Sequence, residues 1–151
     1  MISRILVAID GSEHAWKALD LATVLAKAQQ AELMVLHVIA REPVPDPFPS
    51  YAGIERLPAE EEAARFHYGR TLGDALTRDA QDRARAAGVA KVEARTAEGK
   101  PATMIVETAT AERVDMIVMG SRGLSEPRAL LLGSVSHKVA HLAPCTCVTV
   151  K

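Results

Sequence analysis

The sequence predicts an α/β fold, an open doubly wound sheet of five parallel strands with helices on both faces. Short apolar runs alternate with longer stretches of helical periodicity, in the order β-α-β-α-β-α-β-α-β. The first run, Ile5 to Ile9, is unbroken and rich in β-branched residues, which is typical of a strand buried on both faces of a parallel sheet. The first helical stretch presents mainly alanine and leucine at helical spacing, which suits a helix lying close on a sheet.

The first apolar run, Ile5 to Ile9, ends at Asp10 and predicts the first strand. Gly11 then forms the turn. Ser12 is a candidate N-cap, because its hydroxyl can accept a hydrogen bond from an unpaired amide in the first helical turn. The helix is expected to continue to about Gln30.

A second strand is expected over Leu33 to Ile39, interrupted by His37. We expect His37 to be a hydrogen-bonded histidine within the sheet, because no acidic or thiol partner lies nearby in the sequence. Residues 41–58 hold five prolines, which remove donors and bias the preceding residues away from helix. This segment is therefore expected to be a long loop beside the crevice, either a variable surface loop or a lid.

The second half of the chain repeats the alternation. A long helix is expected over Ala59 to Ala87, ended by Gly88, and an alternating edge strand over Val89 to Ala97. Pro101 suits the first position of a third helix. The remaining elements are the short strand M-I-V-M within Val114 to Met119, a helix over about Leu132 to Leu142 and a strand over Thr146 to Val150.

The segment from Gly120 to Ser136 is the candidate binding site. It holds three glycines and two arginines at a junction between a strand and a helix. Glycines let backbone amides approach an anion closely, and a helix N-terminus adds unpaired amides and a positive dipole end. These residues alone leave two alternatives, a phosphate-binding loop or a surface loop that binds nothing. Asp10 would face the same crevice if its strand neighbours the strand before Gly120.

Length and composition limit the classes of protein. At 151 residues the chain is most simply one domain over 1–151. No apolar run approaches the ~20 residues of a membrane-spanning helix, and the N-terminus is a poor signal peptide, so a cytoplasmic location is expected. A net charge of −1 and an aromatic content of 3% do not favour a nucleic-acid partner.

Several catalytic motifs are missing. There is no G-x-G-x-x-G after the first strand, no P-loop and no nucleophile elbow. His137 and His141 lack the glutamate of a zinc protease, so we expect surface histidines. A receiver domain would need an aspartate after the third strand, where the chain has Ala97-Glu98-Gly99.

Cys145 and Cys147 are expected to be reduced and to share one face of a strand, with a four-thiolate site between two chains as a remote alternative.

Three stretches together carry a family resemblance. They are I-L-V-A-I-D-G-S at Ile5 to Ser12, G-K-P-A-T-M-I-V-E-T-A before D-M-I-V-M-G-S-R-G, and L-L-L-G-S-V-S-H-K-V-A-H-L-A-P-C. The most specific pattern is G-x2-G-x9-G-[ST], formed by Gly120, Gly123, Gly133 and Ser134. The chain thereby resembles the universal stress protein family, and its ATP-binding branch in particular. The resemblance implies a Rossmann-like fold of the adenine nucleotide alpha hydrolase type, with strand order 3-2-1-4-5.

The resemblance also implies roles for individual residues. Asp10 should hold the ribose or a phosphate-bound Mg²⁺, and Ala8 and Val38 should border the adenine. Met119, Gly120, Arg122 and Gly123 should lie along the ribose and phosphates. Amides and hydroxyls for the phosphates should come from Gly133, Ser134, Val135 and Ser136.

Two departures from the family pattern occur, Glu126-Pro127 between the glycines and Thr146 in place of the usual proline after Cys145. Family members commonly pair through the last strand, so a homodimer through residues 146–150 is expected. The favoured function is a nucleotide-dependent stress-response regulator that binds ATP without efficient turnover, because no candidate general base besides Asp10 is evident. The alternatives are a slow ATPase or self-phosphorylating enzyme, and an interaction module that binds no nucleotide.

Overall fold

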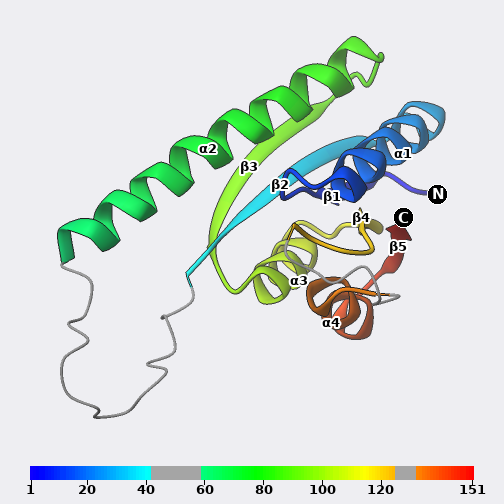
Figure 1. The fold of residues 1–151 in the computed structure, drawn as a ribbon. Coiled ribbons are helices and arrows are strands. Elements are labelled where there is room, and N and C mark those ends of the chain that lie inside the picture. The colour runs from blue at the N-terminus through cyan, green and yellow to red at the C-terminus, as the bar shows by residue number, and fades with distance from the viewer. Residues whose placement is uncertain (42–58, 125–131) are drawn as a thin grey trace.

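The computed structural model describes residues 1–41, 59–124 and 132–151 (Figure 1). Strands and helices alternate along the chain as expected. The elements are β1 (Arg4–Ala8), α1 (Glu13–Gln29), β2 (Glu32–Ala40), α2 (Ala59–Ala86), β3 (Val92–Gly99), α3 (Pro101–Ala111), β4 (Met116–Gly120), α4 (Ser134–Leu142) and β5 (Thr146–Val150).

The five strands form one sheet in the order β3-β2-β1-β4-β5, which confirms the expected order. All neighbouring strands are parallel. The chain moves outward from β1 to β2 and β3, then returns to place β4 on the other side of β1. The strand order therefore reverses between β1 and β4, and in open α/β sheets such a reversal opens a crevice at the carboxyl ends of the strands.

Helices cover both faces of the sheet, as the sequence predicts, and each face has its own core. Alternating side chains of β1 show the division, since Ile5 and Val7 pack with α1 and α2, whereas Leu6 packs with α3 and α4. The α1–α2 face is rich in alanine, which allows close helix–sheet packing. Both cores extend across several strands of the sheet, so the strands that end at the crevice are packed on both faces.

The predicted helix boundaries rest on identifiable capping contacts. The Ser12 hydroxyl accepts a hydrogen bond from the amide of Ala15, which confirms the N-cap of α1. Gly88 has a φ of +98°, the left-handed conformation expected just beyond the end of α2. Pro101 is the first residue of α3, as predicted.

The first residue of the third strand was predicted three positions too early, at Val89. β3 begins at Val92, because Val89 is used to end α2, with its amide donating to the carbonyl of Ala84 at 3.2 Å. β3 also continues to Gly99, because the long strand β2 offers a partner as far as Ala40. The last helix begins at Ser134 rather than near Leu132.

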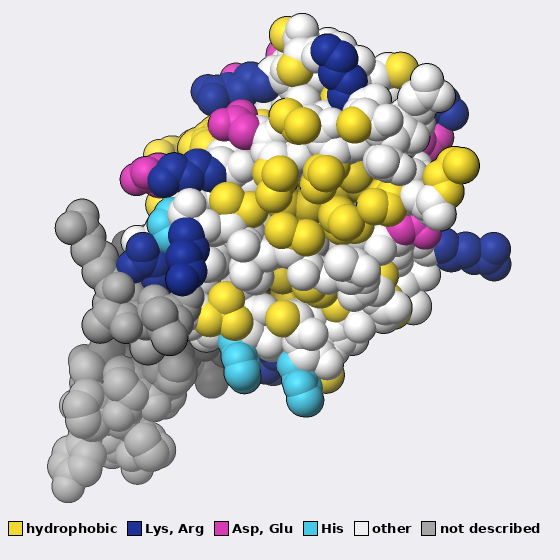
Figure 2. Space-filling model, turned by 90° about the vertical axis from the view of Figure 1, so that its right-hand side faces the viewer, with side chains coloured by type: hydrophobic (Ala, Val, Ile, Leu, Met, Phe, Trp, Pro, Cys, Tyr) yellow, Lys and Arg dark blue, Asp and Glu magenta, His cyan; other side chains and the backbone are white. Residues whose placement is uncertain are grey.

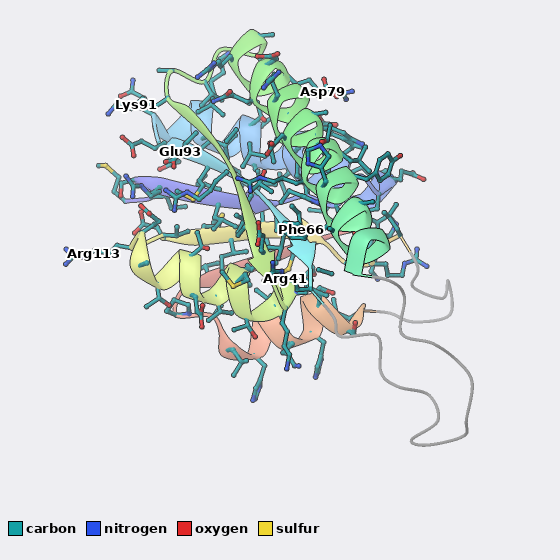
Figure 3. All side chains as sticks on the ribbon, turned by 90° about the vertical axis from the view of Figure 1, so that its left-hand side faces the viewer. Arg41, Phe66, Asp79, Lys91, Glu93 and Arg113 are labelled. Atoms are coloured by element: carbon teal, nitrogen blue, oxygen red, sulfur yellow. The ribbon has the colours of Figure 1, made fainter. Side chains whose placement is uncertain are left out.

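The segment 41–58 lies outside the described residues except for Arg41. The Arg41 guanidinium lies over the ring of Phe66 on α2, 4.7 Å from its centroid, and Figure 3 shows the two side chains together. Among the described helices, none combines the length and apolarity that a membrane span requires.

Candidate functional site

A cavity of about 140 Å³ opens at the carboxyl ends of β1, β2 and β4, where the strand order reverses. It is lined by residues from three strands, from the starts of α1, α3 and α4, and from the segment after β4. The lining residues are Ala8, Ile9, Asp10, Ser12, Ala15, Leu36, Val38, Pro101, Ile105, Met119, Gly120, Arg122, Gly123, Gly133, Val135 and Ser136. Residues that are distant in sequence thus line one cavity.

Every site residue expected from the sequence lines this cavity except Ser134. Ser134 is the exposed first residue of α4. Sequence reasoning missed further lining residues, notably Ser12, Leu36, Pro101 and Ile105. Leu36 and Ile105 read in sequence as ordinary core positions, so no sequence signal distinguished them from the rest of the core.

One half of the cavity is apolar. Leu36 and Val38 come from β2, Ile105 comes from α3, and Met119 comes from the end of β4. Three of them belong to the core between the sheet and the α3–α4 layer, and Val38 packs against that core. A flat apolar group entering here would be contacted by side chains that are already held in place.

Asp10 lies at the polar side, directly after β1. One oxygen of its carboxylate accepts the amide of Ser12 at 2.9 Å, which fixes the turn into α1. The carboxylate is thereby oriented by the backbone that follows it. Among the described residues, no group of three or more histidine, cysteine, aspartate or glutamate side chains could hold a metal ion on its own.

Ser121, between the lining residues Gly120 and Arg122, connects the end of β4 to β5 and to the start of α4. It is 1% exposed, and its amide donates to the carbonyl of Val150 at 2.7 Å. Its own carbonyl accepts the amide of Gly133 at 2.6 Å and the hydroxyl of Ser136 at 2.8 Å. These bonds hold the start of α4 beside the end of β4.

The N-terminus of α4 faces the cavity. Gly133 is its N-cap, and the first helical bond runs from the amide of His137 to the carbonyl of Gly133 at 2.9 Å. Val135 and Ser136 belong to the first turn, whose amides have no intrahelical acceptor. The Gly133 amide and the Ser136 hydroxyl are already used to fix the loop, so the amides of the first turn are the groups best suited to an anion.

His14 is the main feature of the site that sequence reasoning missed. Its Nδ1 lies 3.0 Å from the Ser121 hydroxyl, and its Nε2 lies 3.3 Å from an Arg122 nitrogen. His14 lies more than a hundred positions before both partners, and a single histidine early in a helix gives no sequence signal of such a contact.

The other residues singled out in the sequence have structural positions. His37 donates from Nδ1 to the carbonyl of Ile9 at 2.8 Å, as expected for a histidine within the sheet. His137 and His141 are exposed on α4. Cys145 and Cys147 are free thiols packed against the α3–α4 core, and burial raises the pKa of both.

Comparisons with known proteins agree with this architecture. The universal stress protein family model matches residues 1–151. "Universal stress protein YxiE" of Bacillus subtilis (strain 168) is 41% identical over 151 residues, covering 100% of both chains. Among solved structures, UspA from Lactobacillus plantarum has a TM-score of 0.83 at 23% identity, covers 99% of this chain and 98% of its own, and shares the fold. A universal stress protein solved in complex with cAMP has a TM-score of 0.72 at 29% identity, covering 99% of this chain and 97% of that one.

Proposed function

The chain belongs to the universal stress protein family, and we propose that its cavity binds an adenine nucleotide, with ATP as the expected ligand, and that occupancy regulates a stress response. The observation that carries this proposal is the division of one cavity into an apolar half and an anion-binding half. The apolar half suits a purine, and the segment around Gly120 and Gly123 with the start of α4 suits phosphates.

The similar protein in complex with cAMP supports an adenine ligand. A cyclic monophosphate and a triphosphate differ in how many charges the site must neutralise. Arg122 and the first-turn amides of α4 offer a cation and several hydrogen-bond donors for phosphate oxygens. The titration with AMP, cAMP and ATP decides how many phosphates the site takes.

Asp10 fits a role in holding Mg²⁺ together with the phosphates. Mg²⁺ is usually bound by one or two carboxylates plus phosphate oxygens and water, rather than by a dedicated protein cage. One carboxylate beside a phosphate-binding helix terminus meets that description, and the ion would neutralise charge on the phosphates.

Binding without efficient turnover is the favoured function, and a slow ATPase or self-phosphorylating enzyme is the alternative. Hydrolysis needs a group that orients the attacking water in addition to phosphate ligands. Among the described residues that line the cavity, Asp10 is the one carboxylate, and it already orients the turn into α1.

The test is to extract the purified protein with acid and identify any released nucleotide, then to titrate the emptied protein with MgATP, AMP, cAMP and adenosine by calorimetry. We expect MgATP to bind more tightly than AMP or cAMP. Gly123→Val should abolish nucleotide binding without unfolding the protein. An emptied, folded protein that binds none of these ligands would overturn the proposal, and phosphate release lost in Asp10→Ala would favour the enzyme.

A homodimer through β5 is a second proposal. β5 is an edge strand, and Val148 and Val150 are only partly buried on it. Figure 2 views the side of the molecule where β5 lies in Figure 1, and hydrophobic side chains gather at the centre of that face. An open apolar edge favours pairing with a second chain.

Light scattering after size-exclusion chromatography tests the dimer. Val148→Lys should shift the protein to monomer, whereas Leu72→Lys on α2 should leave the mass unchanged. A wild-type monomer at high micromolar concentration would refute this assembly.

The cytoplasmic location stays a prediction.

A further inference from the structure

We propose that His14 is a positioning residue that holds the Arg122 guanidinium at the cavity so that it meets the phosphates of the bound nucleotide. This inference rests on the proposed function and assigns a role to a side chain that does not itself line the cavity.

The two hydrogen bonds of His14 define which nitrogen carries the proton. Arg122 Nη2 lies 3.3 Å from Nε2, and a guanidinium can only donate, so Nε2 is the acceptor. The proton of the neutral ring therefore lies on Nδ1, which donates to the Ser121 hydroxyl at 3.0 Å. The ring thus bridges a buried serine and the cavity arginine in one tautomer.

The position of His14 is fixed by the backbone rather than by its own side chain. A Cβ atom built on Gly120 would lie 2.8 Å from His14 Cβ and 2.9 Å from the His14 carbonyl carbon. Because Gly120 lacks that atom, the first turn of α1 sits directly on the end of β4. This contact places the imidazole over the two residues that follow β4.

Restricting the Arg122 side chain before the ligand arrives lowers the entropic cost of phosphate binding. Arg122 lines the cavity between two glycines that give the local chain conformational freedom. A long side chain loses rotamer freedom when it binds a phosphate, and a partner that restricts it beforehand lowers this cost. The planar guanidinium carries five N–H donors in a fixed geometry, so a single hydrogen bond to His14 can orient the whole group toward a phosphate.

The effect must therefore depend on the phosphate. His14→Ala is expected to weaken binding of ADP and ATP about three- to tenfold, as loss of one hydrogen bond that orients a charged group would. Binding of adenosine should change less than twofold. Arg122→Ala should give a larger loss for the same ligands, and the double variant should be no weaker than Arg122→Ala alone.

Calorimetric titration of ATP, ADP and adenosine into the full-length variants measures these changes. His14→Gln can present an acceptor near the position of Nε2 and should restore part of the loss, whereas His14→Asn matches the Nδ1 position and should not. His141→Ala, an exposed histidine on α4, is the matched control and should bind as wild type.

Long-range ¹H–¹⁵N spectra of the imidazole give a readout that packing alone would not move. Wild type should show His14 protonated on Nδ1, and Arg122→Ala should shift that signal. Additive losses in the double variant, equal losses for adenosine and ATP, or a His14 proton on Nε2 would each overturn the inference. If wild type binds neither ATP nor adenosine, the proposed function itself fails, so the two failures are distinguishable.

Discussion

The amide of Gly133 donates to the carbonyl oxygen of Ser121 at 2.6 Å, and this bond joins the two ends of the glycine-containing segment. The Ser136 hydroxyl reinforces it by donating to Ser121 at 2.8 Å and to Gly133 at 3.1 Å. The segment that follows β4 is therefore closed at its base independently of any ligand.

Ser136→Ala should loosen this closure. Ser136 is 3% exposed, and losing a buried hydroxyl donor costs about 1 kcal/mol of unfolding free energy. Urea denaturation measures the loss of unfolding free energy. Hydrogen exchange at the Gly133 amide should also be faster in this variant than in wild type. Lys138→Ala, at an exposed position of α4, serves as the control for stability and should change it by less than about 0.5 kcal/mol. An unchanged exchange rate at Gly133 would contradict the role of the hydroxyl.

Gly120→Ala should destabilise the fold. The added methyl would lie 2.8 Å from His14 Cβ, 2.9 Å from the His14 carbonyl carbon and 3.0 Å from the Ala15 nitrogen. These are backbone or near-backbone atoms, so the helix must shift, at a cost of about 1–3 kcal/mol. Thermal unfolding measures the loss. A melting temperature equal to that of wild type would show that α1 tolerates the shift.

Gly69→Ala and Gly73→Ala form a matched pair one turn apart on α2, with opposite expected outcomes. At Gly69 the new methyl would meet Ile39 at 3.4 Å, and helix propensity should add about 0.5–1 kcal/mol of stability. At Gly73 it would lie 2.7 Å from the His37 ring, which its bond to Ile9 holds in place. We expect Gly73→Ala to be destabilising. Denaturant midpoints compare the two, and the same sign for both would refute the close approach of His37.

Acid should lower the folding stability of the protein, in part because Glu32 becomes protonated. Hydrogen bonds from Lys91 and then Arg4 lower the pKa of Glu32 from 4.5 to about 2. A lowered folded-state pKa means that the stabilisation is present above pH 4.5 and is lost as pH falls toward 2. Figure 3 shows Lys91 at the start of β3, on the surface, so the effect is modest.

Urea midpoints across this pH window should fall less steeply in Glu32→Gln than in wild type. The exposed α3 residue Glu107 provides the control, and Glu107→Gln should follow the wild-type slope. Parallel slopes for wild type and Glu32→Gln would show that these ion pairs do not affect folding.

Periodicity alone was enough to predict the alternation of elements, because each strand and helix carries its own pattern. The boundaries of β3 were not predictable, since they depend on how α2 ends at Val89 and how far β2 offers partners. Asp10 and the glycines were found because turn chemistry marks them locally. His14 and Ser121 were missed, because their contact depends on a close helix–strand approach that only the folded chain creates.

β1 lies at the centre of the sheet, although it is the first strand to be synthesised. Its neighbour β4 begins at Met116, and Asp115 reaches back to Ser3 across 112 residues. At about 5–20 residues per second, β1 waits roughly 5–20 s on the ribosome for that neighbour. During this interval its apolar edge can pair with other chains. Nascent chains arrested before β4 should therefore be cleaved by protease faster than complete ones. The N-terminal strand is thus protected from aggregation only after the C-terminal part of the chain has been synthesised.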